Sequence, residues 1–238
     1  MTSAEPGIEH DHLDNLADRT NKLRAGVLGA NDGIVSVAGL VLGVAATTTA
    51  RAPILTAGLA GLVAGAMSMA VGEYVSVSTQ RDTEQALLAK ERHELATDPV
   101  GEEAELADLY VQRGLTPELA RQVAQHLHAG PRKLEAHAEL ELGITIGRTV
   151  SPWSAAIASF VAFSLGGLLP LIAILAPPPS WRSPVTFVTV VVALVLTGTV
   201  SARLGGAQPG RAVVRVVVGG ALAMAITYGI GRLVGMHV

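Results

Sequence analysis

Five stretches of mostly apolar residues constrain this chain more than any other feature, because a helix of about 20 such residues spans a lipid bilayer. The stretches are residues 25–48, 54–77, 153–175, 185–204 and 213–234. Of the 238 residues only 16% are charged, whereas about 25% is typical of soluble domains, and no Asp or Glu follows Glu141. We therefore predict an all-α integral membrane protein with five transmembrane helices.

A polar segment separates the second and third apolar stretches. Between Gln80 and Arg148 it carries 13 acidic and 8 basic residues, and helix-breaking residues at 98–99, 114 and 130–131 divide it into four helical pieces. We predict that it forms a helical domain. The predicted organisation is a polar N-terminal segment (1–24), two transmembrane helices (25–79), the helical domain (80–150) and three further transmembrane helices (151–238).

The distribution of basic residues predicts the orientation in the membrane. With five crossings, 14 of the 17 Lys and Arg residues fall on the side of the N-terminus and the helical domain, and the positive-inside rule makes that side cytoplasmic. The C-terminus is then outside. The first 21 residues have no secretory-signal pattern. Fourteen Arg against three Lys is typical of GC-rich coding sequence, which favours a bacterial cytoplasmic membrane.

Two features of composition exclude other functions. A net charge of −3 is unsuited to a nucleic-acid-binding protein, which needs a concentrated basic face to neutralise phosphates. The chain has no cysteine, so disulfides, thiolate metal sites and cysteine nucleophiles are absent.

Only two carboxylates lie inside the predicted spans, Asp32 and Glu73. A charge at the bilayer centre costs at least about 2.5 kcal/mol, so such a residue indicates a function unless it lies near the helix end and reaches water. Met69 is four residues before Glu73 and shares its helix face. A carboxylate and a thioether together suit a borderline divalent transition metal, although a methionine in an apolar helix more often serves packing.

Small residues recur at a spacing of four in the apolar stretches, which lets helices approach closely. The pairs are Gly39 and Gly43, Gly61 and Gly65, and Gly231 and Gly235.

Glutamates and one histidine in the helical domain are paired at helical spacing, so that each pair lies on one face. The pairs are Glu91 and Glu94, Glu102 and Glu105, and His137 and Glu141. Helical bundles bind iron or manganese with such inward-facing carboxylates and histidines, but a solvated acidic surface with salt bridges has the same pattern. We expect the other histidines of the first two thirds, His93, His126, His128 and the pair His10 and His12, to lie on the surface.

Several of these motifs together resemble the vacuolar iron transporter family. They are LRAGVLGANDGIVSVAGLVLG (Leu23–Gly43), GAMSMAVGEYVSV (Gly65–Val77), the residues Gln80, Asp82 and Glu84, and Glu141-Leu142-Gly143. The resemblance extends from Leu23 to the end of the chain. It implies five membrane helices per subunit, a homodimer with the translocation path at its interface, and a cytoplasmic metal-binding domain. It also implies export of Fe²⁺, and often Mn²⁺, from the cytoplasm in exchange for protons.

The resemblance also assigns roles to residues. Asp32 and Met69 match the family's transport site, and Glu73 lies in its GEY motif. The glutamates that match the cytoplasmic metal site are Glu91, Glu94, Glu102, Glu105 and Glu141. The sequence departs from the family at His137 and Ala138, where eukaryotic relatives carry two methionines. An imidazole in place of two thioethers hardens the site, which makes Mn²⁺ or Zn²⁺ more suitable occupants.

We therefore expect a dimeric secondary transporter, not an enzyme, with no catalytic residues and no catalytic cofactor. It would export Fe²⁺ or Mn²⁺ by proton antiport for metal homeostasis, and its partners would be metal ions, protons, membrane lipid and a second copy of the chain. The alternatives are a membrane-anchored ferroxidase and a metal sensor that use the glutamate cluster. The E-x-x-H spacing of ferritin-like di-iron sites does not occur in the helical domain, which argues against the ferroxidase.

Overall fold

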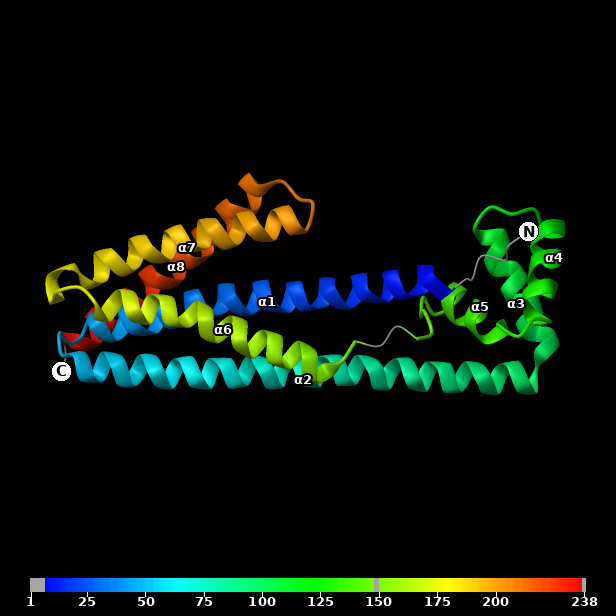
Figure 1. Ribbon diagram of the computed structural model, residues 1–238, viewed down its shortest axis with the longest axis horizontal. Helices are drawn as coiled ribbons and strands as arrows, with labels where there is room; N and C mark the ends of the chain where they lie inside the picture. The colour runs from blue at the N-terminus through cyan, green and yellow to red at the C-terminus, as the bar shows by residue number, and fades with distance from the viewer. Residues whose placement is uncertain (1–6, 148–149, 237–238) are drawn as a thin grey trace. The chain divides into compact units, whose positions relative to one another are not determined.

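The computed structural model describes residues 7–147 and 150–236, with side chains from Ala25 onward. These residues form α helices and one short 3-10 helix, with no strand among them (Figure 1). The elements are α1 (Gly7–Ala45), α2 (Arg51–Thr97), α3 (Pro99–Gln112), α4 (Pro117–His128), α5 (Lys133–Leu140), α6 (Pro152–Leu175), η1 (Pro179–Trp181), α7 (Arg182–Leu204) and α8 (Pro209–Gly235). The all-helical class predicted from the sequence is confirmed for this part of the chain.

The chain divides into two compact units. What we call the polar unit comprises Ser76–Val150 together with the described residues up to Asp14, and the apolar unit comprises Asn15–Val75 and Ser151–Val238. Helix α2 is continuous through the end of the apolar unit into the polar unit.

Five helices of the described residues are long and apolar enough to cross a membrane, as predicted. They are Ala25–Ala45 within α1, then α2, α6, the stretch Pro179–Leu204 that includes α7, and α8. A helix satisfies the backbone hydrogen bonds of its interior within one segment, which is why an apolar chain in lipid adopts this form. The prediction of five spanning helices therefore agrees with the structure in number and in place.

The apolar unit has large apolar side chains on its surface as well as in its core. Val188, Leu196, Val218, Leu222 and Ile226 of α7 and α8 are each more than half exposed. A water-soluble surface with so many exposed apolar side chains would be exceptional, whereas hydrocarbon solvates them without cost. These faces are consistent with contact with lipid or with another apolar helix.

Helix α1 lies in the core of the apolar unit and packs closely against its neighbours. Its residues Ile34, Val37 and Val41 are buried in one cluster with side chains of α2, α6, α7 and α8. Glycine permits the close approach: a Cβ on Gly33 would collide with the carbonyl oxygen of Phe163 in α6. Two of the three predicted glycine pairs have the same role between α1 and α8, where a Cβ on Gly231 would meet the carbonyl of Gly43.

The polar unit is a small helical bundle whose helices start where the sequence predicts. Asp98 caps α3 by accepting a hydrogen bond from the Gly101 amide at 3.0 Å, and Thr116 caps α4. Gly114 follows α3 with a φ of +97°, a backbone conformation that glycine adopts readily. The small core of the polar unit consists of Leu106, Ala107 and Ala124, with Tyr110, Leu127 and Leu140 packed against them.

Candidate metal centre

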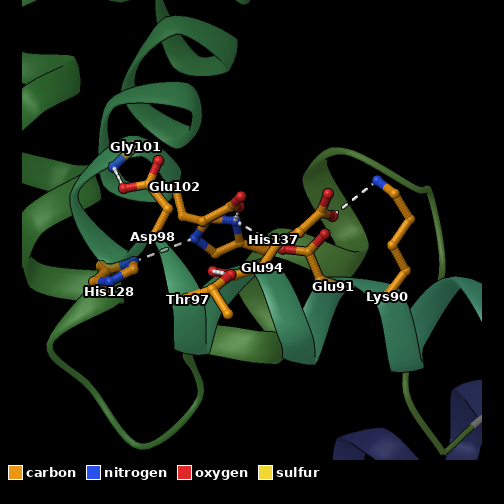
Figure 2. Close-up of polar contacts among 9 residues, drawn as sticks. All are labelled: Lys90, Glu91, Glu94, Thr97, Asp98, Gly101, Glu102, His128 and His137. Atoms are coloured by element: carbon orange, nitrogen blue, oxygen red, sulfur yellow. Dashed lines mark hydrogen bonds and ion pairs between the residues drawn. The ribbon is translucent and has the colours of Figure 1, made fainter.

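Four metal-binding side chains converge inside the polar unit. Glu91 comes from α2, Glu102 from α3 and His137 from α5, and Glu141 is the C-cap residue that follows α5. One ligand atom from each lies within 4.8 Å of those of the other three. Glu91 is 2% exposed, Glu102 8% and His137 0%, so the cluster is inside the bundle and not on its surface. Figure 2 shows three of the four side chains pointing toward one another.

Four atoms of this cluster, one from each residue, are buried without a hydrogen-bond partner among the described residues. His137 Nδ1 lies 3.2 Å from Glu91 Oε1 and 3.6 Å from Glu102 Oε2. Neither these three atoms nor Glu141 Oε2 has a hydrogen-bond partner of acceptable geometry among the described residues. A buried polar atom without a partner costs free energy, and a cation held among these four atoms would satisfy all of them.

Burial and mutual repulsion change the protonation of these groups. Desolvation, followed by the charges of Glu141 and Glu102, raises the pKa of Glu91 to about 7. Desolvation also raises the pKa values of Glu102 and Glu141. The pKa of His137 is lowered by burial and by the nearby His128 and Lys133, which favours the neutral imidazole. A divalent cation among these groups would compete with protons for the carboxylates and for the free nitrogen of the imidazole.

The structure separates two of the predicted glutamates from this cluster. Glu94 is partly exposed and its carboxylate lies 2.8 Å from the ammonium group of Lys90. This contact raises the pKa of Lys90 through a hydrogen bond and the charge of Glu94. Glu105 is exposed. Both glutamates still act on the cluster through their charges. The charge of Glu94 raises the pKa of Glu91, and the charge of Glu105 raises the pKa of Glu102. Glu94 thus forms the surface salt bridge that the sequence left open, whereas Glu91 does not.

His128 corrects one expectation. His93 and His126 are exposed as predicted, but His128 is half-buried, and its Nδ1 lies 3.4 Å from Nε2 of His137. The two rings are 5.6 Å apart between centroids and meet edge to face. The sequence places His128 on the same face of α4 as Ala124, four residues earlier, but only the structure shows that Ala124 is buried. His10 and His12 lie outside the residues whose side chains are described.

A second candidate site lies in the apolar unit, where Asp32 of α1 meets Met69 of α2. The two side chains line a cavity of about 260 Å³ and also a second one of about 420 Å³. The first includes Ser36, whose hydroxyl donates to Asp32 Oδ1 at 3.1 Å. The second cavity is lined also by Arg215 and Asn31. The Oδ1 atom of Asn31 is buried without a hydrogen-bond partner among the described residues. Tertiary packing therefore brings together the carboxylate and the thioether that the sequence singled out.

The third intramembrane residue is placed differently. Glu73 is half-buried on α2, and it is not among the residues that line either of the cavities shared by Asp32 and Met69.

The two sites have different ligand chemistry. Three carboxylates and an imidazole form a mostly hard set that suits Mn²⁺, Fe²⁺ and Zn²⁺. In the apolar unit, Asp32 and Met69 offer an ion one carboxylate and one thioether as ligands.

Comparison with known proteins agrees with this chemistry. The family model described as "VIT family" matches residues 23–232. The chain is 44% identical over 230 residues to the vacuolar iron transporter of Acanthamoeba castellanii, covering 96% of this chain and 84% of that protein. It is 40% identical over 225 residues to vacuolar iron transporter homolog 1 of Oryza sativa subsp. japonica, with 94% and 78% covered. For vacuolar iron transporter homolog 2.1 of Arabidopsis thaliana the identity is 36% over 232 residues, with 97% and 89% covered. With the family model covering most of its length and relatives at this identity, the chain belongs to the VIT family.

Proposed function

We propose that this protein is a secondary transporter that exports a divalent transition metal, Fe²⁺ or Mn²⁺, from the cytoplasm in exchange for protons. The observation that carries the proposal is the buried cluster of Glu91, Glu102, His137 and Glu141, whose facing atoms lack hydrogen-bond partners. The relatives named as vacuolar iron transporters support iron as a substrate. No catalytic residue or catalytic cofactor is part of the proposal.

The ligand set supports a choice among metals. Mg²⁺ and Ca²⁺ prefer oxygen ligands alone, whereas an imidazole nitrogen strengthens the binding of Mn²⁺, Fe²⁺ and Zn²⁺. With His137 as its nitrogen ligand and no thioether in the cluster, the site suits Mn²⁺ and Zn²⁺ as well as Fe²⁺. Zn²⁺ is proposed as an occupant of the polar unit, while Fe²⁺ and Mn²⁺ are proposed as the exported ions.

Asp32 and Met69 are proposed to hold the ion during its passage through the membrane. They line shared cavities within the apolar unit, and a carboxylate in a low-dielectric region needs a cation or a proton to balance its charge. A proton that replaces the metal on Asp32 would therefore release the ion, which is the simplest route to proton antiport. Glu73, one turn from Met69, is proposed as a supporting carboxylate.

The remaining parts of the proposal concern the protein's setting. The polar unit would be cytoplasmic and would capture the ion before transport, because basic residues predict that side as inside. Glu94 and Glu105, whose charges act on the cluster, would attract cations toward it. The resemblance to the family supports a homodimer in the lipid bilayer, and the arginine bias supports a bacterial cytoplasmic membrane.

The experiment is metal flux into liposomes that contain the purified full-length protein. Fe²⁺ and Mn²⁺ are supplied separately under anaerobic conditions, with and without a pH gradient, to wild type, Asp32→Asn and the matched control Asp108→Asn, which changes an exposed carboxylate. We expect flux that the pH gradient increases, that Asp32→Asn abolishes and that Asp108→Asn retains. Binding of Mn²⁺ without flux in any gradient would contradict the transporter and favour a sensor.

A further inference from the structure

His128 is a half-buried residue that the proposed metal site does not use. It ends α4, and its Nδ1 atom lies 3.4 Å from Nε2 of His137 on α5 (Figure 2). Nothing in the ligand set requires this contact, since the four converging atoms come from Glu91, Glu102, His137 and Glu141. A second imidazole against the only nitrogen ligand of that set therefore needs a separate explanation.

The two nitrogens of the His137 ring face different partners. Nδ1 faces the carboxylates of Glu91 and Glu102, at 3.2 and 3.6 Å, whereas Nε2 faces His128. A neutral imidazole carries one proton, on one nitrogen or the other. When a metal takes the lone pair of Nδ1, the proton must be on Nε2. Because the ring is fully buried, that N–H group needs an acceptor, and His128 Nδ1 is the atom at hydrogen-bond distance.

We propose that His128 is a positioning residue for the metal site: it accepts a hydrogen bond from Nε2–H of His137 and so holds Nδ1 of His137 toward the substrate metal. This inference rests on the proposed function, because it requires a divalent cation between His137 and the glutamates. A histidine ligand commonly has its second nitrogen held in this way, and loss of such a partner typically weakens metal binding about 10- to 100-fold. A thioether at position 137 would have no N–H group and would need no such acceptor.

Two substitutions separate hydrogen bonding from packing. In His128→Leu the side chain keeps its bulk but loses the acceptor. In His128→Asn the amide oxygen takes a place close to that of the imidazole Nδ1 and can accept the same hydrogen bond. The matched control is His126→Leu, which changes an exposed histidine of the same helix.

The test is calorimetric titration of Mn²⁺ into the metal-free full-length protein in detergent at neutral pH. We expect His128→Leu to bind Mn²⁺ about 10- to 100-fold more weakly than wild type. His128→Asn should recover most of that loss, and His126→Leu should bind as wild type does. Thermal unfolding of each metal-free variant measures any change in folding, and His128→Ala serves as a second acceptor-free variant if His128→Leu does not fold.

Two results would overturn the inference. Wild-type affinity in the acceptor-free variant would show that His128 only packs, and equal weakening in His128→Asn and His128→Leu would show that the imidazole itself is required. The proposed metal site is tested separately by His137→Ala. If His137→Ala binds Mn²⁺ as tightly as wild type, the site fails as a whole, whereas weak binding in His137→Ala with normal binding in His128→Leu refutes only the role of His128.

Discussion

At the scale of single residues, Glu91 has its protonation changed by its buried position in the polar unit. It is buried between His137 and two further carboxyl groups, and burial raises its pKa from the ordinary value of 4.5 to about 7. Without a cation the protonated form is favoured, and with a cation the charged form is favoured. The occupancy of the site and the protonation of Glu91 are therefore linked.

This linkage predicts opposite pH dependences for stability and for metal binding. Because the pKa of Glu91 is raised in the folded state, its contribution to stability is fully present below pH 4.5 and is lost as the pH rises through about 7. Mn²⁺ must displace the proton, so its affinity should increase over the same range. Thermal unfolding of the metal-free protein and calorimetric titration of Mn²⁺ between pH 5 and 8 measure the two effects. In Glu91→Gln both dependences should become shallower, and slopes equal to those of wild type would contradict the assignment.

Burial also predicts which glutamates matter most for binding. Glu91 is buried in the four-atom cluster, whereas Glu105 is exposed and contributes only its charge. Glu91→Gln should therefore weaken Mn²⁺ binding by about tenfold or more, and Glu105→Gln by much less. Titration of both variants with Mn²⁺ at the same pH and ionic strength makes the comparison. A larger loss in Glu105→Gln would mean that the metal-bound site recruits Glu105 as a ligand.

Among the elements, α1 and α6 depend on a contact that only glycine allows. A Cβ at Gly33 would meet the backbone of α6 at Phe163 and Gly167, and backbone atoms cannot move aside as a flexible side chain can. We expect Gly33→Ala to lower the thermal unfolding temperature and to reduce flux, because Gly33 adjoins Asp32. Gly72→Ala is the control: nothing lies within 4 Å of its added Cβ, so it should be neutral or stabilise α2 by up to about 1 kcal/mol. Unchanged stability in Gly33→Ala would show that α1 and α6 can separate at no cost.

The start of α3 determines where Glu102 lies. Asp98 caps this helix through the Gly101 amide, and Glu102 follows in the first turn. Asp98→Ala should destabilise the polar unit by about 1 kcal/mol and weaken Mn²⁺ binding, because the first turn of α3 would fray. Chemical unfolding and Mn²⁺ titration measure the two losses. Asp108→Ala, which removes an exposed carboxylate from the same helix, should have neither effect.

For the whole molecule, the placement of the two candidate sites in separate units predicts that binding and transport can be separated. Asp32 lies in the apolar unit and Glu91 in the polar unit. Asp32→Asn should abolish Mn²⁺ flux while the polar unit still binds Mn²⁺. Glu91→Gln should reduce flux mainly at low Mn²⁺ concentration, because capture fails while the membrane path remains. Concentration-dependent flux in liposomes, combined with Mn²⁺ titration of the same protein preparations, distinguishes the two losses. Equal loss of both activities in both variants would contradict separate sites.

Much of the fold follows from the sequence alone. Long apolar stretches in lipid must be helical because no water is present to satisfy the backbone, and this reasoning placed the five candidate membrane helices. The breaks of the polar unit were also predictable, since Asp98-Pro99 and Thr116-Pro117 are local capping signals that act within one turn. The resemblance to the family, which the comparisons confirm, came from motifs in the first two apolar stretches and from further motif residues in the polar segment that follows them.

The selection among candidate site residues was decided only by tertiary structure. Glu91 and Glu94 are three residues apart on one helix, yet the first is buried beside His137 and the second pairs with Lys90 near the surface. His128 was expected at the surface because its sequence neighbours do not reveal which face of α4 packs against α5. Periodicity determines which residues share a helix face, because it depends on the local backbone. Burial, and with it pKa and ligand geometry, depends on which other helix covers that face, and this is set by contacts between residues distant in sequence.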